Sequence, residues 1–250
     1  MAGCIRIGTS GWLYRSWRAH LYAGVPMKRW LEHASSTFAT LEINGSFYTQ
    51  IRPETYERWR RETPDDFVFS LKAHRYVTHY KRLRDAEDSV ERLRDQASAL
   101  GDKLACVLWQ LPARMTADEP RLEEFLGVLA RSWPSVRHAF EPRHASWFTP
   151  SVARALSEED VAVVESDAPD FPLWDEVTAD FVYVRLHGHT RKYASSYSAA
   201  SLRRWARDAK RWARSGRDVY VYFDNDAEGA AVGNALALAE LVTPGSRAAA

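Results

Sequence analysis

The 250-residue sequence lacks the features that would assign it quickly to a chemical class. It has only two cysteines, Cys4 and Cys106, without Cys-x-x-Cys spacing or a neighbouring histidine. We therefore predict buried free thiols, each inside a strand, in a reducing compartment. The net charge is only +1, so the overall balance predicts no attraction to nucleic acid or to a membrane.

Several sequence motifs are also missing. There is no G-x-G-x-x-G and no Walker motif, so a nucleotide cofactor is not predicted. Without a G-x-S-x-G elbow, no Ser/His/Asp triad is indicated. No apolar run approaches the roughly 20 residues needed to cross a bilayer, and an expected strand from Cys4 leaves no room for a signal peptide. We expect a soluble, cytoplasmic protein without a membrane partner.

What the chain does contain is a repeated pattern of apolar segments that finish on polar side chains. The segments are Cys4–Ser10, Thr40–Asn44, Phe67–His74, Leu104–Leu111, Arg137–Arg143, Val161–Asp167, Phe181–Gly188 and Val219–Asp226. Their lengths fit strands, and a hydrophobic content of 46% is enough for a sizeable core. Buried strands in general have no reason to end on polar residues eight times in succession.

Stretches with helical periodicity lie between these strands. They cover Pro26–Ser36, Pro53–Thr63, Asp85–Leu100, Thr116–Arg131, Thr149–Leu156, Ser198–Ser215 and Ala227–Leu241. Thr116 and Glu119 have the spacing of a capping box, which predicts a helix start there. Alternation of strands and helices with short connections predicts an α/β fold, a (β/α)8 TIM-barrel-like single domain. An open doubly wound sheet is the main alternative.

One connection departs from this regularity. Residues 167–180 contain Pro169 and Pro172, which interrupt any helical pattern, so we expect this connection to be irregular. No linker rich in Gly, Ser or Pro divides the chain. We expect one barrel domain over residues 1–243 and a frayed C-terminal tail over 244–250.

In a parallel barrel the C-terminal ends of all strands point to one face, so the polar ends should converge there. Side chains alternate along a strand, and Glu42 with Asn44, and Arg185 with His187, share one face while their neighbours are apolar. The apolar set is expected to pack against the helices and the polar set to point into the barrel. The sequence thus predicts the place of the site more clearly than its chemistry.

The densest group of chemically active side chains is Glu141–Trp147, at the end of the fifth expected strand. Arg143 suits bidentate contact with an anion, while Glu141 or His144 suits proton transfer. The alternative is an Arg–Glu pair that only fixes a loop. A buried Glu141 would in either case need a cationic neighbour.

Further candidates end the other strands. Arg185 and His187 precede Gly188, where the backbone can turn sharply. His187 and His189 leave a metal site open, but no carboxylate spacing requires one, so no metal ligand is predicted. Lys72 near a carboxylate is a candidate base or Schiff-base former, or alternatively half of an ion pair that fills the barrel.

Two further segments admit two interpretations each. Asp224–Asp226 precedes the last expected helix; its aspartates would repel an anion, so we expect them to cap that helix. The basic and aromatic loops His74–Arg82 and Arg191–Tyr193, the latter with Tyr197, could stack bases and hold phosphates, or cover a small polar ligand.

Seven segments together resemble the YecE-like family of uncharacterised barrels (domain of unknown function 72). They are IGTSGW at Ile7–Trp12, LEINGSFY at Leu41–Tyr48, FSLKAH at Phe69–His74, WQLP at Trp109–Pro112, AFEPRHASW at Ala139–Trp147, YVRLHG at Tyr183–Gly188 and VYFDNDAEGAAVGNA at Val221–Ala235. The resemblance implies a TIM-barrel-like fold and no established reaction. Asp224 departs from the family, which usually has Asn there.

We expect an enzyme that acts on a small polar, anionic or polyhydroxylated substrate by acid/base catalysis at the C-terminal face of the barrel, as an isomerase, lyase or hydrolase. The alternatives are a nucleic-acid-processing or nucleic-acid-binding barrel, not favoured by the charge, and a non-catalytic sensor of a small ligand. The candidate catalytic residues are Glu141, His187, Lys72, Glu42 and Asp167. The candidate substrate-binding residues are Asn44, Gln110, Arg143, His144, Trp147, Arg185, Tyr193, Tyr197 and Asn225.

Overall fold

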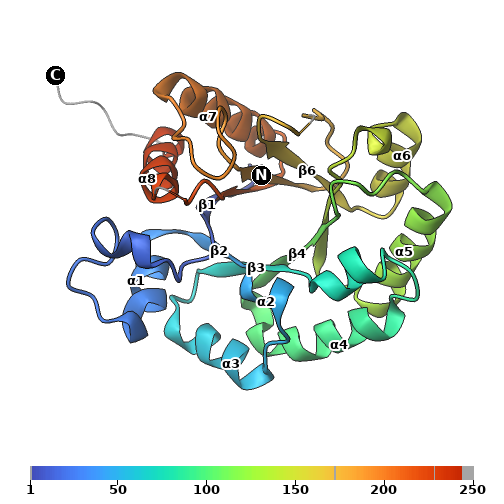
Figure 1. The fold of residues 1–250 in the computed structure, drawn as a ribbon, viewed down its shortest axis with the longest axis horizontal. Helices are drawn as coiled ribbons and strands as arrows, with labels where there is room; N and C mark the ends of the chain where they lie inside the picture. The colour runs from blue at the N-terminus through green and yellow to red at the C-terminus, as the bar shows by residue number, and fades with distance from the viewer. Residues whose placement is uncertain (1, 172, 228, 244–250) are drawn as a thin grey trace.

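A computed structural model of the chain describes residues 2–171, 173–227 and 229–243, and Figure 1 shows its ribbon. Eight parallel strands pair in chain order and close into a barrel through pairing of the first strand with the eighth. The strands are β1 (Ile5–Ser10), β2 (Thr40–Ile43), β3 (Val68–Lys72), β4 (Leu104–Gln110), β5 (Arg137–Glu141), β6 (Ala162–Asp167), β7 (Phe181–Leu186) and β8 (Asp218–Phe223). The predicted (β/α)8 barrel is confirmed, and an open sheet is excluded.

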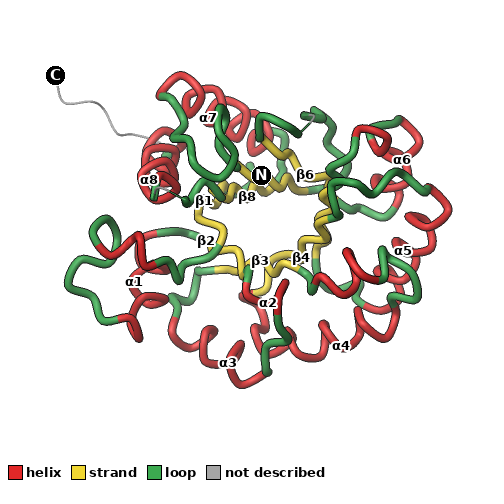
Figure 2. Tube along the Cα trace, in the orientation of Figure 1, coloured by secondary structure: helices red, strands yellow, loops and turns green. Residues whose placement is uncertain are grey.

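Helices surround the ring of strands, as Figure 2 shows. The α-helices are α1 (Trp30–Thr37), α2 (Gly45–Tyr48), α3 (Pro53–Glu62), α4 (Glu87–Ala97), α5 (Glu119–Ser132), α6 (Pro150–Glu158), α7 (Ala199–Arg214) and α8 (Ala230–Val242). Shorter turns are the 3-10 segments η1 (Arg15–Arg18), η2 (Met27–Arg29), η4 (Ser98–Lys103) and η5 (Ala145–Trp147), and the π-turn η3 (Tyr76–Tyr80). Within the described residues, no helix combines the length and the apolar character needed to cross a membrane.

The helix starts follow local capping chemistry. Thr149 and Ser198 accept backbone N–H groups at the starts of α6 and α7, as Ser and Thr caps commonly do. The predicted capping box of Thr116 and Glu119 is wrong: Asp118 is the residue whose side chain accepts the N–H of Arg121. Asp118 replaces Thr116 as the capping residue, because an Asp side chain caps a helix by itself and needs no Glu or Gln at the third helical position.

Two other local expectations have different outcomes. The connection between β6 and β7 contains no helix among its described residues, as the prolines predicted. Cys106 is a buried free thiol in β4, but Cys4 precedes β1 and is exposed, so the prediction of a buried Cys4 is wrong. The frayed tail expected over 244–250 lies outside the described residues.

Alternation along the strands creates two separate cores. Outward-facing side chains such as Leu41, Val184 and Phe223 pack against the helices in one large cluster. The inward set forms a smaller cluster inside the barrel, which includes Leu108, Tyr183 and other side chains of β4–β8. Because a parallel sheet is covered on both faces, both sets are buried. Phenols inside the barrel need polar partners, and this places hydrogen bonds directly below the C-terminal mouth.

Candidate active site

The centre of the candidate site is the guanidinium of Arg185, near the end of β7, which has no exposed surface. Its Nε and Nη2 donate to the two carboxylate oxygens of Glu42 at 3.0 and 2.8 Å. Its Nη1 donates to Glu141 Oε2 at 3.1 Å, and Nη2 reaches Asp224 Oδ2 at 3.2 Å. One planar cation therefore joins three carboxylates from β2, β5 and the residue after β8, through charge-assisted hydrogen bonds.

The charges of this cluster depend on one another. Burial opposes ionisation of Glu141, but Arg143 and Arg185 outweigh it and hold the pKa of that carboxyl well below its usual value. Burial likewise opposes ionisation of Asp224, whose pKa Arg185 and His187 lower. Removing the cation would thus leave buried carboxylates without compensation.

His187 follows β7 and lies between two of these carboxylates. Its Nδ1 is 2.9 Å from Asp224 Oδ2, a close contact without the alignment of a hydrogen bond, and its Nε2 is 3.4 Å from Glu141 Oε1. The rings of Phe171 and Tyr193 meet the imidazole edge-on, with centroids 5.6 and 5.5 Å away. The imidazole is therefore held between two acids, within hydrogen-bond distance of Glu141 and in close contact with Asp224.

Lys72 ends β3 and is only 9% exposed. Its Nζ lies 4.4 Å from the centroid of the Phe47 ring and has no hydrogen-bond or ion-pair partner in the described part of the chain. Burial, followed by the charge of Arg185, lowers the pKa of this ammonium to about 8, while Glu42 acts in the opposite direction. Near neutral pH a fraction of Lys72 is therefore a free amine.

A second layer, containing Arg143, lies over the cluster. Arg143 Nη2 donates to Glu141 at 3.2 Å, and Nη1 donates to the hydroxyl of Tyr193 at 3.3 Å. The guanidinium carbon is 4.4 Å from the Phe171 ring centroid, and the buried Nε has no partner among the described residues. Tyr193, at a φ of 62°, is 39% exposed. An anionic ligand at this edge would satisfy the remaining donor of Arg143.

Hydroxyl and amide groups complete the site. Tyr183 OH donates to Glu42 Oε2 at 2.6 Å, and Ser10 Oγ also donates to Glu42. Asn44 Nδ2 donates to Ser10 Oγ at 2.7 Å, while its Oδ1 is buried without a partner among the described residues. Gln110 is paired in register with Glu141, and its amide donates to the backbone oxygen of Leu111.

The structure brings together Glu42, Lys72, Glu141, Arg143, Arg185 and His187, with Asn44, Gln110 and Tyr193 at the edge. Asp167 points the other way, to Trp205 Nε1 at 3.4 Å and His189 Nδ1 at 3.3 Å, because β6 turns its neighbour Ser166 inward. His144 accepts the N–H of Ser146 and starts η5.

The remaining candidates also support loops rather than the cluster. Trp147 donates to the backbone oxygen of Met115, and Tyr197 binds the backbone of Gly188 and of Asp167. Asn225 Nδ2 donates to Ser195 O at 3.0 Å and to Asn234 Oδ1 at 2.9 Å.

Three members of the cluster were missed by the sequence reasoning: Ser10, Ser166 and Asp224. The expectation that Asp224 caps the last helix is wrong, because Gly229 is the residue before α8. The alternation of side chains along β6 and β8 could have identified Ser166 and Asp224. Tyr222 points inward, so Asp224, two residues later, shares its direction and Asn225 does not. Ser166 Oγ, two residues after the inward Val164, donates to Glu141 Oε1 at 2.8 Å.

No group of three or more His, Cys, Asp or Glu among the described residues is arranged to hold a metal ion. The carboxylates instead converge on Arg185. An apolar hollow of about 520 Å3 adjoins the cluster, lined among others by Trp12, Tyr14, Asn44 and Trp59. It lies beside the mouth and meets the cluster at Asn44.

The similarity of this chain to known proteins extends over the whole barrel. The family model described as "Protein of unknown function DUF72" matches residues 6–249. The UPF0759 protein YunF of Bacillus subtilis (strain 168) is 24% identical over 247 residues, covering 85% of this chain and 86% of YunF. The UPF0759 protein YecE of Escherichia coli (strain K12) is 30% identical over 145 residues, covering 58% of this chain and 50% of YecE.

Solved structures give the same grouping. A DUF72 family protein from Thermotoga maritima superposes with a TM-score of 0.85 at 27% identity, covering 96% of this chain and 99% of that one. A DUF72 family protein from Enterococcus faecalis gives a TM-score of 0.82 at 18% identity, with 95% of each chain covered. At 18% identity the likeness concerns the fold.

Proposed function

Since the chain belongs to the DUF72 family, a family defined by sequence rather than by a reaction, we propose its function from the chemistry of the site. The protein is an enzyme that acts on a small polar substrate, anionic or polyhydroxylated, by acid/base catalysis at the C-terminal face of the barrel. Isomerase, lyase and hydrolase chemistry all fit this set of side chains.

The observation that supports this proposal is the buried cluster around Arg185. Three carboxylates, an imidazole and a lysine amine that has no partner in the described part of the chain face one another with little exposure to solvent. Apolar side chains of similar volume would fill the same space at a smaller desolvation cost. Clusters of this kind are common at catalytic sites, where pKa values are set by mutual contact.

The side chains suit distinct roles. His187 transfers the proton, since one imidazole nitrogen can donate a proton while the other accepts one, and Glu141 and Asp224 orient it. Lys72 supplies a second basic or electrophile-stabilising group. Arg143, with an unused Nε, binds the anionic or hydroxyl-rich part of the substrate, and Tyr193 closes over it.

The test begins with a thermal-shift screen of the full chain against phosphorylated sugars, carboxylates, nucleotides and divalent metals. A ligand at a hundred times its dissociation constant raises the free energy of unfolding by about 2.7 kcal/mol, which is readily detected. Turnover of any hit is then measured in Glu141→Gln. We expect this variant to bind the ligand and to lower kcat by about a hundredfold or more.

Glu165→Gln is the matched control. Glu165 is also a buried barrel carboxyl, on β6, but it faces outward, and burial together with Asp175 raises its pKa to about 8. Its replacement by a neutral amide should leave kcat unchanged. Equal kcat in Glu141→Gln and wild type would reject the catalytic role of Glu141. Tight binding without turnover in wild type would reject the enzyme in favour of a sensor. Oligonucleotide binding that weakens steeply with salt would favour the nucleic-acid alternative.

A further inference from the structure

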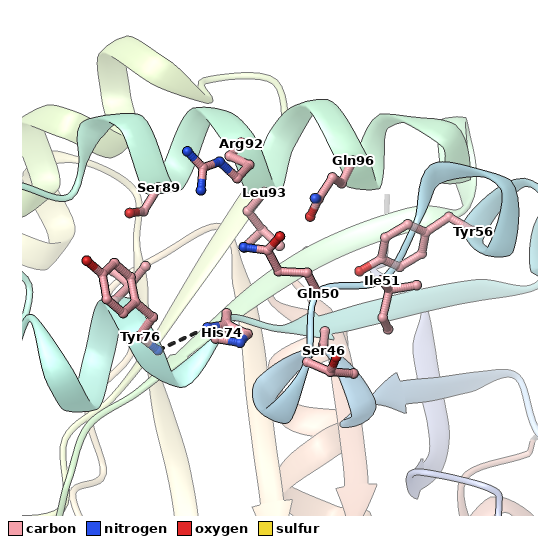
Figure 3. Close-up of a pocket in the computed structure, with 12 residues that line it drawn as sticks. Ser46, Gln50, Ile51, Tyr56, His74, Tyr76, Ser89, Arg92, Leu93 and Gln96 are labelled. Atoms are coloured by element: carbon pink, nitrogen blue, oxygen red, sulfur yellow. Dashed lines mark hydrogen bonds between the residues drawn. The ribbon is translucent and has the colours of Figure 1, made fainter.

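A second cavity lies at the same end of the barrel, outside β3 and away from the Arg185 cluster. Its volume is about 300 Å3, and α4, the α2–α3 connection and the start of η3 enclose it, as Figure 3 shows. Its lining consists of Ser46, Thr49, Gln50, Ile51, Tyr56, His74, Tyr76, Val77, Ser89, Arg92, Leu93 and Gln96. We call it the α4 pocket. None of these residues belongs to the cluster.

A buried hydroxyl faces this pocket without a partner. Tyr56 of α3 has no exposed surface, and its OH makes no hydrogen bond within the described residues. In Figure 3 the phenol is directed into the space beside Ile51 and below Gln96. Burial raises the pKa of Tyr56, so the group stays a neutral donor. A buried hydroxyl without a partner is costly, and a ligand acceptor would remove that cost.

The opposite side of the pocket is cationic. Arg92 of α4 projects over it in Figure 3 and has no hydrogen-bond or ion-pair partner in the described part of the chain. Among the described residues, no aspartate or glutamate lines the cavity. Burial, followed by the neighbouring Arg75, lowers the pKa of His74, whose Nδ1 accepts the N–H of Tyr76 at 3.1 Å. The charge that a ligand would meet is therefore positive and comes from Arg92.

Apolar surface separates these two polar ends. Leu93 and Ile51 stand between Arg92 and Tyr56 in Figure 3, and Val77 adds to the same lining. The side-chain amides of Gln50 and Gln96 border this stretch and make no hydrogen bonds within the described residues. A complementary molecule has an anionic group at one end, an apolar middle and a hydrogen-bond acceptor at the other end.

We propose that the α4 pocket is a binding site for a small organic anion, a carboxylate or a phosphate ester, with its anionic group on Arg92 and a hydroxyl or carbonyl oxygen on Tyr56. The site is independent of the proposed reaction. It adjoins the cluster at α2, where Ser46 Oγ donates to the backbone oxygen of Lys72 at 2.6 Å and Phe47 covers the Lys72 ammonium.

The experiment is a titration of the full chain with 4-hydroxybenzoate, benzoate and phenyl phosphate, followed by calorimetry and by amide chemical shifts. We expect saturable binding of one molecule, with shifts concentrated in α4 and η3. Arg92→Gln should weaken binding of all three anions about tenfold, because a charge-assisted contact is lost. Tyr56→Phe should weaken 4-hydroxybenzoate severalfold and leave benzoate unchanged. Arg207→Gln, an exposed arginine of α7, is the matched control and should change nothing.

Because Tyr56 is part of the core, its replacement could also disturb the fold. Gln50→Ala changes an exposed residue of the same pocket without altering the core, and it should likewise weaken binding of the probes. Equal affinity in wild type and Arg92→Gln would overturn the proposal. Absence of saturable binding by all three probes would do the same. Binding that is lost in Arg143→Gln and retained in Arg92→Gln would place the anion in the cluster at the mouth, which also overturns the assignment to the α4 pocket.

Discussion

Each end of the barrel contains an arginine between carboxylates, and the two arginines differ in their burial and in the number of carboxylates around them. At the N-terminal end, Arg137 binds Asp218 at 2.7 Å and Asp180 at 3.1 Å, and its side chain is 30% exposed. At the C-terminal end, Arg185 is completely buried among Glu42, Glu141 and Asp224. The two partly exposed ion pairs of Arg137 are explained by a structural role alone, since they join β5, β8 and the residue before β7 at the N-terminal end of the barrel.

The C-terminal cluster contains more than closure requires. It has three carboxylates for one guanidinium. Its surplus negative charge is offset by Arg143 and by Lys72, which has no direct partner among the described residues. His187 lies in contact with two of the acids. The comparison supports our proposal that the C-terminal cluster serves proton transfer and anion binding, whereas the N-terminal pairs are explained by structure alone.

The largest difference should appear when the two arginines are removed. Arg185→Met leaves the buried Glu42 and Glu141 and the partly buried Asp224 without their shared cation, and we expect a loss of about 3–5 kcal/mol in the free energy of unfolding. Arg137→Met breaks partly exposed pairs and should cost about 1 kcal/mol or less. Urea unfolding at pH 7 measures both. Equal losses would contradict the distinction between the two ends.

Arg185→Lys sharpens the same test. Lysine keeps the positive charge but cannot make the planar, two-pronged contact with Glu42. We expect its stability to lie between those of wild type and Arg185→Met. At pH 4 the penalty of Arg185→Met should shrink, because the uncompensated carboxyls can then take up protons. A penalty that is the same at both pH values would mean that packing, not charge, explains it.

Much of the fold could be predicted because its signals are local. Apolar segments of strand length, separated by amphipathic stretches, specify eight strand–helix units, and closure follows from their number and similar length. Pro169 also indicated the irregular connection after β6. The start of α5 was placed wrongly because two capping residues, Thr116 and Asp118, compete within one turn, and the outcome depends on the loop before it.

The site was predictable only in part, and strand parity explains the division. Glu141, Arg185 and the other strand-end residues on the inward face do converge. Asp167 and Asn225 are also polar residues at strand ends, but they face outward. Their neighbours Ser166 and Asp224 were overlooked although parity favours them. Contacts between loops, such as Phe171 and Tyr193 around His187, depend on tertiary packing that no local pattern describes.

A smaller effect should separate the two buried lysines. Lys103 Nζ donates to Thr63 O at 2.7 Å and Arg60 O at 2.8 Å, whereas Lys72 Nζ has no such partner in the described residues. Lys72→Met should therefore raise the free energy of unfolding at pH 7 by roughly 1–3 kcal/mol, because an unfavourable buried charge is removed. Lys103→Met should lower it, because two backbone carbonyls lose their donor. Thermal and urea unfolding measure both variants.

Titration of Lys72 should also make stability depend on pH. Its pKa is about 8 in the folded protein and 10.5 ordinarily, so the unfolded chain binds more protons between these values. Wild-type stability should consequently rise with pH from 8 to 10.5, and Lys72→Met should lack that contribution. If Lys72→Met is more stable and also inactive towards a ligand found by the screen, stability has been exchanged for function at this position. A destabilised Lys72→Met would contradict the unfavourable burial.

A further pair of effects concerns two aspartates, Asp218 at the start of β8 and Asp226 after its end, whose pKa values shift in opposite directions. Burial, with Asp224 nearby, raises the pKa of Asp226 to about 7, although Trp17 Nε1 donates to it. For Asp218, burial is outweighed by Arg137 and by the N–H of Cys4, which lower its pKa. The folded chain therefore holds a proton on Asp226 that the unfolded chain releases above pH 4.

Asp226 should consequently make stability fall as pH rises from about 4 to 7, while Asp218 makes it rise as pH increases through the ordinary aspartate range. Asp226→Asn keeps an acceptor for Trp17 and removes the titration, so the variant should be more stable than wild type at pH 8 and indistinguishable from it at pH 4. Asp218→Asn should show the reverse order: less stable at pH 8 and closest to wild type at low pH. Unfolding by urea across this pH range tests both variants. If the free energy of unfolding of Asp226→Asn followed pH in parallel with that of wild type, Asp226 would be ionised in the folded protein and its predicted protonation would be wrong.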